Sequence, residues 1–195
     1  NTRILMAQSQ ALFVSANRLK RDTAIGGSVD DDLIRPYVYM AQQRWILPVL
    51  GTDLYNKLCT DIDTGSVSGV YETLLDEYVI PATVQYAFSQ LIPYLRVRFV
   101  NNAVVVMNSE QSAAATYDDL KPLIDQANDM GSFHRQRLID YLCDKSSSYP
   151  EYTSNTGSDL CPTTNNYTQG LNVDIVNPDL KYQAFLTAIG KCNIC

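Results

Sequence analysis

Apolar residues recur at helical spacing over most of the first 145 residues. After Asp30-Asp31-Asp32 they form one stripe that includes Ile34, Val38 and Ala41. This spacing is typical of an amphipathic helix with one face packed on a core. A central stretch is apolar on two faces, as expected of a helix with neighbours on both sides. We predict helices over about these ranges: 16–23, 33–51, 52–64, 70–95 and 116–143.

Small polar residues stand where helices should begin. Their side-chain oxygens accept hydrogen bonds from the first free backbone N–H groups; the candidates are Ser15, Thr52 and Thr116. Pro48 and Pro81 predict kinks, because proline lacks the N–H that a helix interior needs. Gly51 is expected to end one helix, and Gly131 to bend the last one.

Residues 95–107 change to a two-residue period. Apolar positions alternate with Arg96 and Arg98, Asn101-Asn102 suits a tight turn, and a β-branched run follows. We predict a β-hairpin at about residues 95–107. Arg96 and Arg98 share one strand face, so they are candidate subunit-interface residues; a solvated strand face is the alternative.

Helical signals fade after residue 145. The last 45 residues are poor in charge and hold fourteen Ser, Thr and Asn residues. Large aromatic side chains remain, and such residues are enriched in interfaces. We therefore read residues 146–195 as an extended arm that orders against another subunit; a tail packed on its own domain is the alternative. The candidate interface residues in this arm are Tyr149, Tyr152, Tyr167, Tyr182 and Phe185.

These patterns predict a mainly α fold, a small helical bundle with one β-hairpin insertion and an extended C-terminal arm. The bundle is assigned to residues 1–145 and the arm to residues 146–195. The chain of 195 residues is long enough for one core. Its net charge of −6 argues against a surface that coats DNA. No uncharged apolar run approaches the ~20 residues of a membrane span, so no membrane partner is expected.

Recognisable catalytic motifs are missing. His134 is the single histidine and lies on the apolar stripe of the last predicted helix, where packing is the simpler interpretation. Asp61, Asp63 and Glu72 occupy three positions of a calcium loop, but glycine is absent from the sixth position, Ser66. We predict no catalytic, cofactor-binding or metal-binding residue and no enzymatic activity.

The five cysteines argue against a secreted disulfide framework. Their number is odd, and no basic and apolar signal segment opens the sequence. Reduced thiols are therefore expected. The pair Cys192 and Cys195 lacks the other two ligands that a structural zinc ion requires.

Four segments resemble a known family. They are residues 51–59 (GTDLYNKLC), 71–81 (YETLLDEYVIP), 137–143 (RLIDYLC) and 149–152 (YPEY). They are similar to the head-to-tail connector (ring or adaptor) proteins of tailed bacteriophages, most closely the ring proteins of crAss-like phages. The likeness covers roughly residues 30–152 and concerns helix packing and loops, so it carries over no active-site residue.

The resemblance implies a virion structural subunit of the head–tail neck, assembled in the host cytoplasm. It implies a homo-oligomeric ring, twelvefold in such families, that docks below the portal and meets other neck and tail rings. Genomic DNA would pass through without specific binding, which suits an acidic chain. Another neck or tail-completion protein, a small intracellular helical enzyme and a regulatory binding module remain alternatives.

Overall fold

A computed structural model describes residues 11–95, 97–100, 103–106, 116–153 and 160–163, with no side-chain detail in the two strands. Within these ranges the chain is mainly helical, as predicted. The helices are α1 (Ala16–Asp22), α2 (Asp31–Ala41), α3 (Leu47–Thr64), α4 (Val70–Leu74), α5 (Ile80–Leu95), α6 (Tyr117–Asp144) and α7 (Pro150–Thr153), with π-helical turns η1 (Gln42–Ile46) and η2 (Leu75–Val79) and a 3₁₀ turn η3 (Ser146–Ser148).

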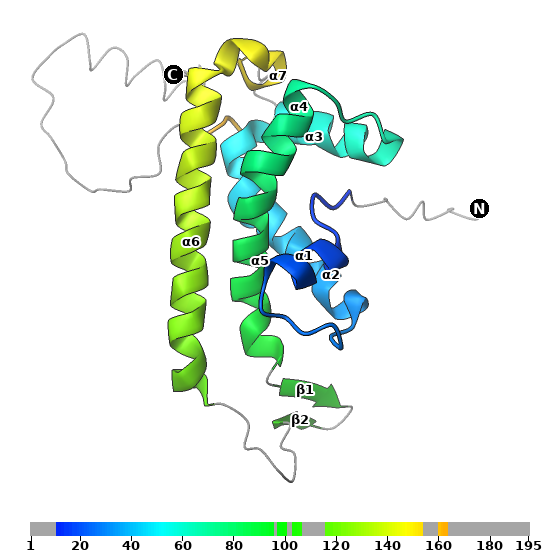
Figure 1. Cartoon of the computed structure of the whole chain (residues 1–195), viewed down its shortest axis with the longest axis vertical. Helices are drawn as coiled ribbons and strands as arrows, with labels where there is room; N and C mark the ends of the chain where they lie inside the picture. Colours follow the sequence, from blue (N-terminus) through cyan, green and yellow to red (C-terminus); the bar gives the residue numbers. More distant parts are fainter. Residues whose placement is uncertain (1–10, 96, 101–102, 107–115, 154–159, 164–195) are drawn as a thin grey trace, which may run out of the picture.

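Helices α5 and α6 lie side by side and form the long axis of the molecule, with α2 on the other side of α5 (Figure 1). The predicted stripe is confirmed, because Ile34, Val38 and Ala41 are buried. α5 buries residues toward both α2 and α6, as its two apolar faces predicted. This central placement explains why so few polar residues interrupt its sequence.

Two of the predicted N-caps are confirmed. The Ser15 side chain accepts from the backbone N–H of Arg18, and Thr116 forms a reciprocal capping box with Asp119. The predicted bend at Gly131 is wrong, because α6 runs as one helix through this position. A side chain there would place its Cβ 2.9 Å from Cε1 of Tyr86, so the glycine is needed for close packing against α5.

The two prolines predicted to kink helices each follow a π-helical turn, and the sharp break in the helix path lies at a glycine. Pro48 and Pro81 each come shortly after a π-helical turn. The turns are closed by the N–H groups of Leu47 and Ile80, which donate to carbonyls five residues earlier. The wider turn accommodates proline, which lacks an N–H and clashes with the carbonyl four residues before it. The sharp break lies at Gly51, whose φ of 75° and ψ of 163° leave the helical region.

A buried glutamine ties the chain's early residues to this framework. Gln42 is fully buried. Its Oε1 accepts from the N–H of Phe13 at 2.9 Å, and its Nε2 donates to the carbonyl of Ala11 at 3.2 Å. The same Nε2 lies 3.2 Å from the hydroxyl of Tyr55, so the buried amide has partners on both its groups.

Two short strands follow α5. β1 (Val97–Val100) pairs antiparallel with β2 (Ala103–Val106), with Arg98 opposite Val105. The pair lies beyond the end of α5, away from α7 (Figure 1). Each strand has four residues, so the strands form a small appendage to a helical body.

The structure contradicts part of the division at residue 146. Residues 146–153 form η3 and α7, and α7 packs on α3. Tyr149 and Tyr152 are fully buried in the same core as the bundle. The bundle therefore continues past residue 145, because these two aromatic rings complete its hydrophobic core.

Candidate functional site

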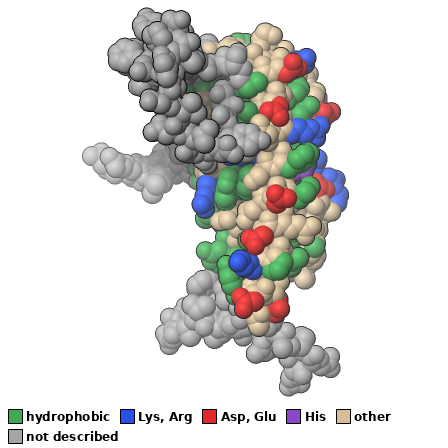
Figure 2. Space-filling model, turned by 90° about the vertical axis from the view of Figure 1, so that its left-hand side faces the viewer, with side chains coloured by type: hydrophobic (Ala, Val, Ile, Leu, Met, Phe, Trp, Pro, Cys, Tyr) green, Lys and Arg blue, Asp and Glu red, His purple; other side chains and the backbone are tan. Residues whose placement is uncertain are grey.

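One side of α6 carries a row of partly exposed apolar side chains. Leu123 is 50% exposed, Met130 40% and Phe133 60%. Leu123 and Met130 lie at one edge of the stripe of Ala127 and Leu138, which is buried against the bundle, and Phe133 lies farther round the helix. Figure 2 shows hydrophobic side chains along this face of the molecule among charged ones. Large apolar side chains gathered on one helix face are typical of a surface that a partner covers.

The row borders a groove between three helices. Residues 22–24 at the end of α1 form one wall, Gln85 and Phe88 of α5 form the floor, and Leu123 to Met130 of α6 form the other wall. The groove encloses about 340 Å³. This volume lies near the lower end of the range for binding clefts in proteins.

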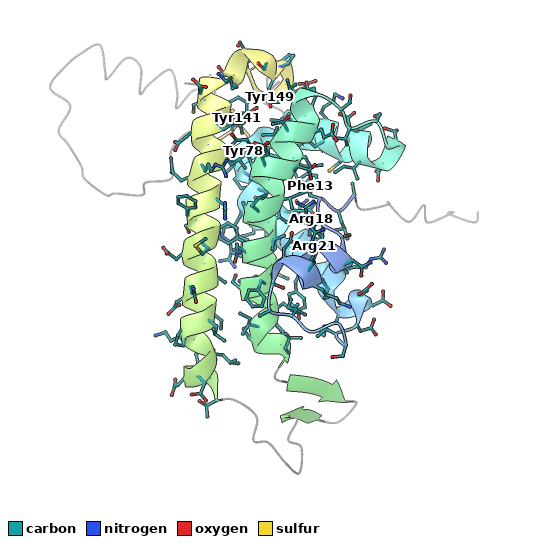
Figure 3. All side chains as sticks on the ribbon, viewed as in Figure 1. Phe13, Arg18, Arg21, Tyr78, Tyr141 and Tyr149 are labelled. Carbon is teal, nitrogen blue, oxygen red and sulfur yellow. The ribbon has the colours of Figure 1, made fainter. Side chains whose placement is uncertain are left out.

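The charged residue at the groove is already paired. Asp22 accepts from Nε of Arg18 at 3.0 Å and from Nε of Arg21 at 2.8 Å. The hydrogen bond from Arg21 lowers the pKa of the Asp22 carboxyl from its usual value. Figure 3 shows Arg18 and Arg21 on α1. An apolar occupant of the groove would therefore not leave this carboxylate without a counter-charge.

An aromatic stack fixes α6 against α5 beside the groove. The rings of Trp45 and Tyr86 lie parallel, with centroids 4.5 Å apart. The Tyr86 ring also packs closely on Gly131, and its hydroxyl lies 3.3 Å from Oγ of Ser132. Because the ring is held by Trp45, Gly131 and Ser132, the spacing of α5 and α6 is set before any partner binds.

Four tyrosines pack together at the opposite end of α6. Tyr78 stacks on Tyr141 with centroids 4.0 Å apart, and the Tyr141 hydroxyl lies 3.0 Å from that of Tyr149 (Figure 3). Tyr149 also donates to the carbonyl of Val70 at 3.0 Å, while Tyr71 meets its ring edge-on. The prediction that Tyr149 contacts another subunit is wrong, because its ring is enclosed by its own chain.

Tyr152 is likewise fully buried within the bundle. Its assignment to a subunit interface is also wrong, for the same reason. Helix α7 carries it back onto α3, so its ring fills core space that another subunit cannot reach.

Residues 160–163 also pack on their own domain, at the break in α3. Thr52 donates its N–H to the carbonyl of Leu160 at 3.2 Å, and its hydroxyl accepts from the N–H of Leu160 at 3.0 Å. Thr163 donates to the carbonyl of Pro48 at 2.8 Å. A Cβ at Gly51 would lie 2.7 Å from Cγ of Pro162. The Thr52 hydroxyl, predicted to cap a helix, therefore holds a distant segment.

The structure does not test the assignment of the other predicted interface residues. Arg96, Tyr167, Tyr182 and Phe185 lie outside the described residues. Arg98 lies in β1, opposite Val105, and its side chain is not described. Their assignment to subunit contacts stays a prediction.

His134 lies at the edge of the apolar row. Its ring is 5.4 Å from that of Phe133 and nearly perpendicular to it. Burial, and then the charge of Arg137, lower the pKa of His134 from its usual value. The neutral imidazole favoured by this setting suits packing at an apolar surface.

Two cysteines differ from the expectation of reduced thiols. Cys143 and Cys161 are both disulfide-bonded. The expectation is wrong for these two cysteines, since it rested on the number of cysteines and on a leader segment rather than on the tertiary structure. Cys59 is a free thiol, and burial raises its pKa, which lowers its thiolate content.

The acidic residue Asp61, in the last turn of α3, has a structural role. Both Asp61 oxygens lie 2.6 Å from Nζ of Lys57, and Gly65 closes the helix with a φ of 64°. Within the described ranges, no group of three or more His, Cys, Asp or Glu side chains is placed to hold a metal ion. The same part of the chain contains no helix with the length and hydropathy needed to cross a membrane.

Sequence reasoning missed the groove and the exposed row on α6. The available signal was the width of the apolar face, because Leu123, Met130 and Phe133 extend it beyond one edge of the stripe that the buried residues define. Only the packing of α1 and α5 shows that a groove lies beside them.

The chain matches the family model of DUF6712, described as a family of unknown function, over residues 46–161. This match covers more than half of the chain. The chain belongs to the DUF6712 family. Its matched region runs from η1 through α7 to the segment bound at the α3 break. No curated protein and no solved structure matches the chain.

Proposed function

We propose that this DUF6712 protein is a structural subunit of a phage head–tail connector ring. It would dock below the portal and continue the DNA channel toward the tail, acting by assembly rather than catalysis. The exposed apolar row of Leu123, Met130 and Phe133 carries the proposal. A helix face of this kind needs a partner to remove it from water, and a neighbouring ring subunit supplies one.

The likeness of residues 30–152 to ring proteins of tailed phages supports this choice of partner. A closed ring requires two different complementary patches on each subunit. The groove beside α6 is one candidate patch. The strand pair β1–β2, which follows the end of α5, and the residues after Thr163, which lie outside the described part of the chain, are candidates for the other patch.

The charge of the chain fits a conduit. A net charge of −6 per subunit, repeated around a ring, repels the phosphate backbone. Genomic DNA would then pass without adhering to the channel wall. The proposal places the protein in the virion neck after assembly in the host cytoplasm.

Mass measurement with and without the portal protein of the same genome tests the proposal. The full chain mixed with portal should form a closed ring of about twelve copies, the number in connector families, visible by electron microscopy. Binding to a tail ring instead of the portal would favour another level of the neck. A chain that stays monomeric with every neck component would contradict the proposal and favour a regulatory binding module.

A further inference from the structure

The groove beside α6 has the form of a receptor for an amphipathic helix. Its apolar lining comes from Phe88, Leu123, Ala127 and Met130, and its rim is polar. Helix-binding grooves of this kind take side chains spaced at i, i+3, i+4 and i+7. The stacked Tyr86 ring and Gly131 hold α5 and α6 at fixed spacing, so little ordering free energy is lost when a helix enters.

One segment of the same sequence carries that spacing. Tyr182, Phe185, Leu186 and Ile189 stand at i, i+3, i+4 and i+7. These four fall on one face of a helix, while Gln183 and Thr187 fall on the other. Residues 182–189 contain no charged side chain. This matches a groove in which the one carboxylate among the described lining residues, Asp22, is already paired with two arginines.

We propose that residues 182–189 of one copy bind as a helix in the groove formed by α1, α5 and α6 of the adjacent copy. The proposal rests on the proposed function for its adjacent copy. It adds which segment and which surface make the contact.

The path of the chain permits this contact. Thr163 is bound to Pro48, at the start of α3, and α3 does not line the groove. The residues between Thr163 and Tyr182 can span up to ~60 Å when extended. Donor segment and acceptor groove are different patches, and a contact of that kind repeats head to tail and closes into a ring.

Photo-crosslinking between isotopically distinct full chains tests the contact. One copy carries p-benzoylphenylalanine in place of Phe185, and the other is unsubstituted and labelled with ¹⁵N. After mixing with portal and irradiation, mass spectrometry should find crosslinks from the unlabelled position 185 to labelled peptides containing residues 85–88 or 123–130. Crosslinks within one copy, or to any other surface, overturn the proposal.

A matched pair of methionines provides the variant test. Met130 is 40% exposed at the groove, and Met40 is 45% exposed on α2. Met130→Glu should reduce ring association about tenfold, as expected when one anchor contact of an interface is lost. Met40→Glu should leave it unchanged. Equal association of the two variants overturns the proposal.

Two further measurements keep the result interpretable. Circular dichroism melting reports whether Met130→Glu folds, and Phe185→Ala tests the donor side without altering the bundle. If rings form normally in all variants, the groove contact is wrong while the connector function stands. If the unsubstituted chain forms no ring with portal, the connector function itself fails.

Discussion

The two halves of α6 differ in how completely the chain covers them. At its C-terminal half, Tyr78, Tyr141 and Tyr149 stack and hydrogen-bond into a closed cluster. At its N-terminal half, Leu123 and Met130 remain half exposed beside a groove. The apolar side chains of this helix are therefore covered at one end and partly exposed at the other. This difference indicates where the monomer is complete and where a partner is required.

Removal of a ring from the closed half should have the largest effect. Tyr149→Ala deletes a fully buried aromatic side chain and its hydrogen bonds to Tyr141 and Val70. We expect the free energy of unfolding to fall by about 3–5 kcal/mol, the usual cost of an aromatic-to-alanine change in a core. Urea denaturation measures it.

Tyr117 provides the matched control, because it is a tyrosine at the other end of α6 and is 57% exposed. Tyr117→Ala should change the free energy of unfolding by less than about 0.5 kcal/mol. Equal losses in the two variants would contradict the view that only one end of α6 is closed.

The break in α3 gives the next largest effect. Gly51→Ala puts a side chain at a positive φ of 75° and within 2.7 Å of the Pro162 ring. We expect a loss of about 1–3 kcal/mol in stability. Hydrogen exchange should also show faster exchange at the amides of Leu160 and Thr163, which anchor the later segment.

A second substitution separates the two causes. Pro162→Gly in the Gly51→Ala background removes the steric clash and leaves the backbone strain. Partial recovery of stability is expected. No recovery would show that the contact with residues 160–163 contributes little to the fold.

Alkaline pH should weaken the closed half next. Burial, and then the hydrogen bond to Glu151, raise the pKa of Tyr71 to about 12. Between the ordinary tyrosine pKa of about 10 and this value, the unfolded chain loses the proton while the folded chain keeps it. Stability should therefore fall as pH rises from about 10 to 12. Urea midpoints across this window measure the slope, and Tyr71→Phe should make it shallower.

The exposed apolar row of α6 should show the smallest effect on folding. Phe133 is 60% exposed, so Phe133→Ser should change the free energy of unfolding by less than about 0.5 kcal/mol. Thermal melting measures this. A large loss would mean that the apolar row is part of the monomer's own core, and the contrast between the two halves of α6 would disappear.

The sequence by itself determined the helices and most of their ends. The stripe of Ile34, Val38 and Ala41 and the caps at Ser15 and Thr116 are local features, because a helix period and an N-cap involve residues only a few positions apart. The polar, charge-poor composition after residue 145 is also a local feature of the sequence, and it predicted an arm.

Only the tertiary structure decided which side chains are covered. Tyr149 and Tyr152 are of a residue type that is common in protein interfaces. They nevertheless complete the core, because α7 returns onto α3. Leu123 and Met130 are of residue types that are usually buried in a core. They nevertheless stay partly exposed, because no described element lies over them. Burial depends on contacts between residues far apart in sequence, and local spacing carries no record of those contacts.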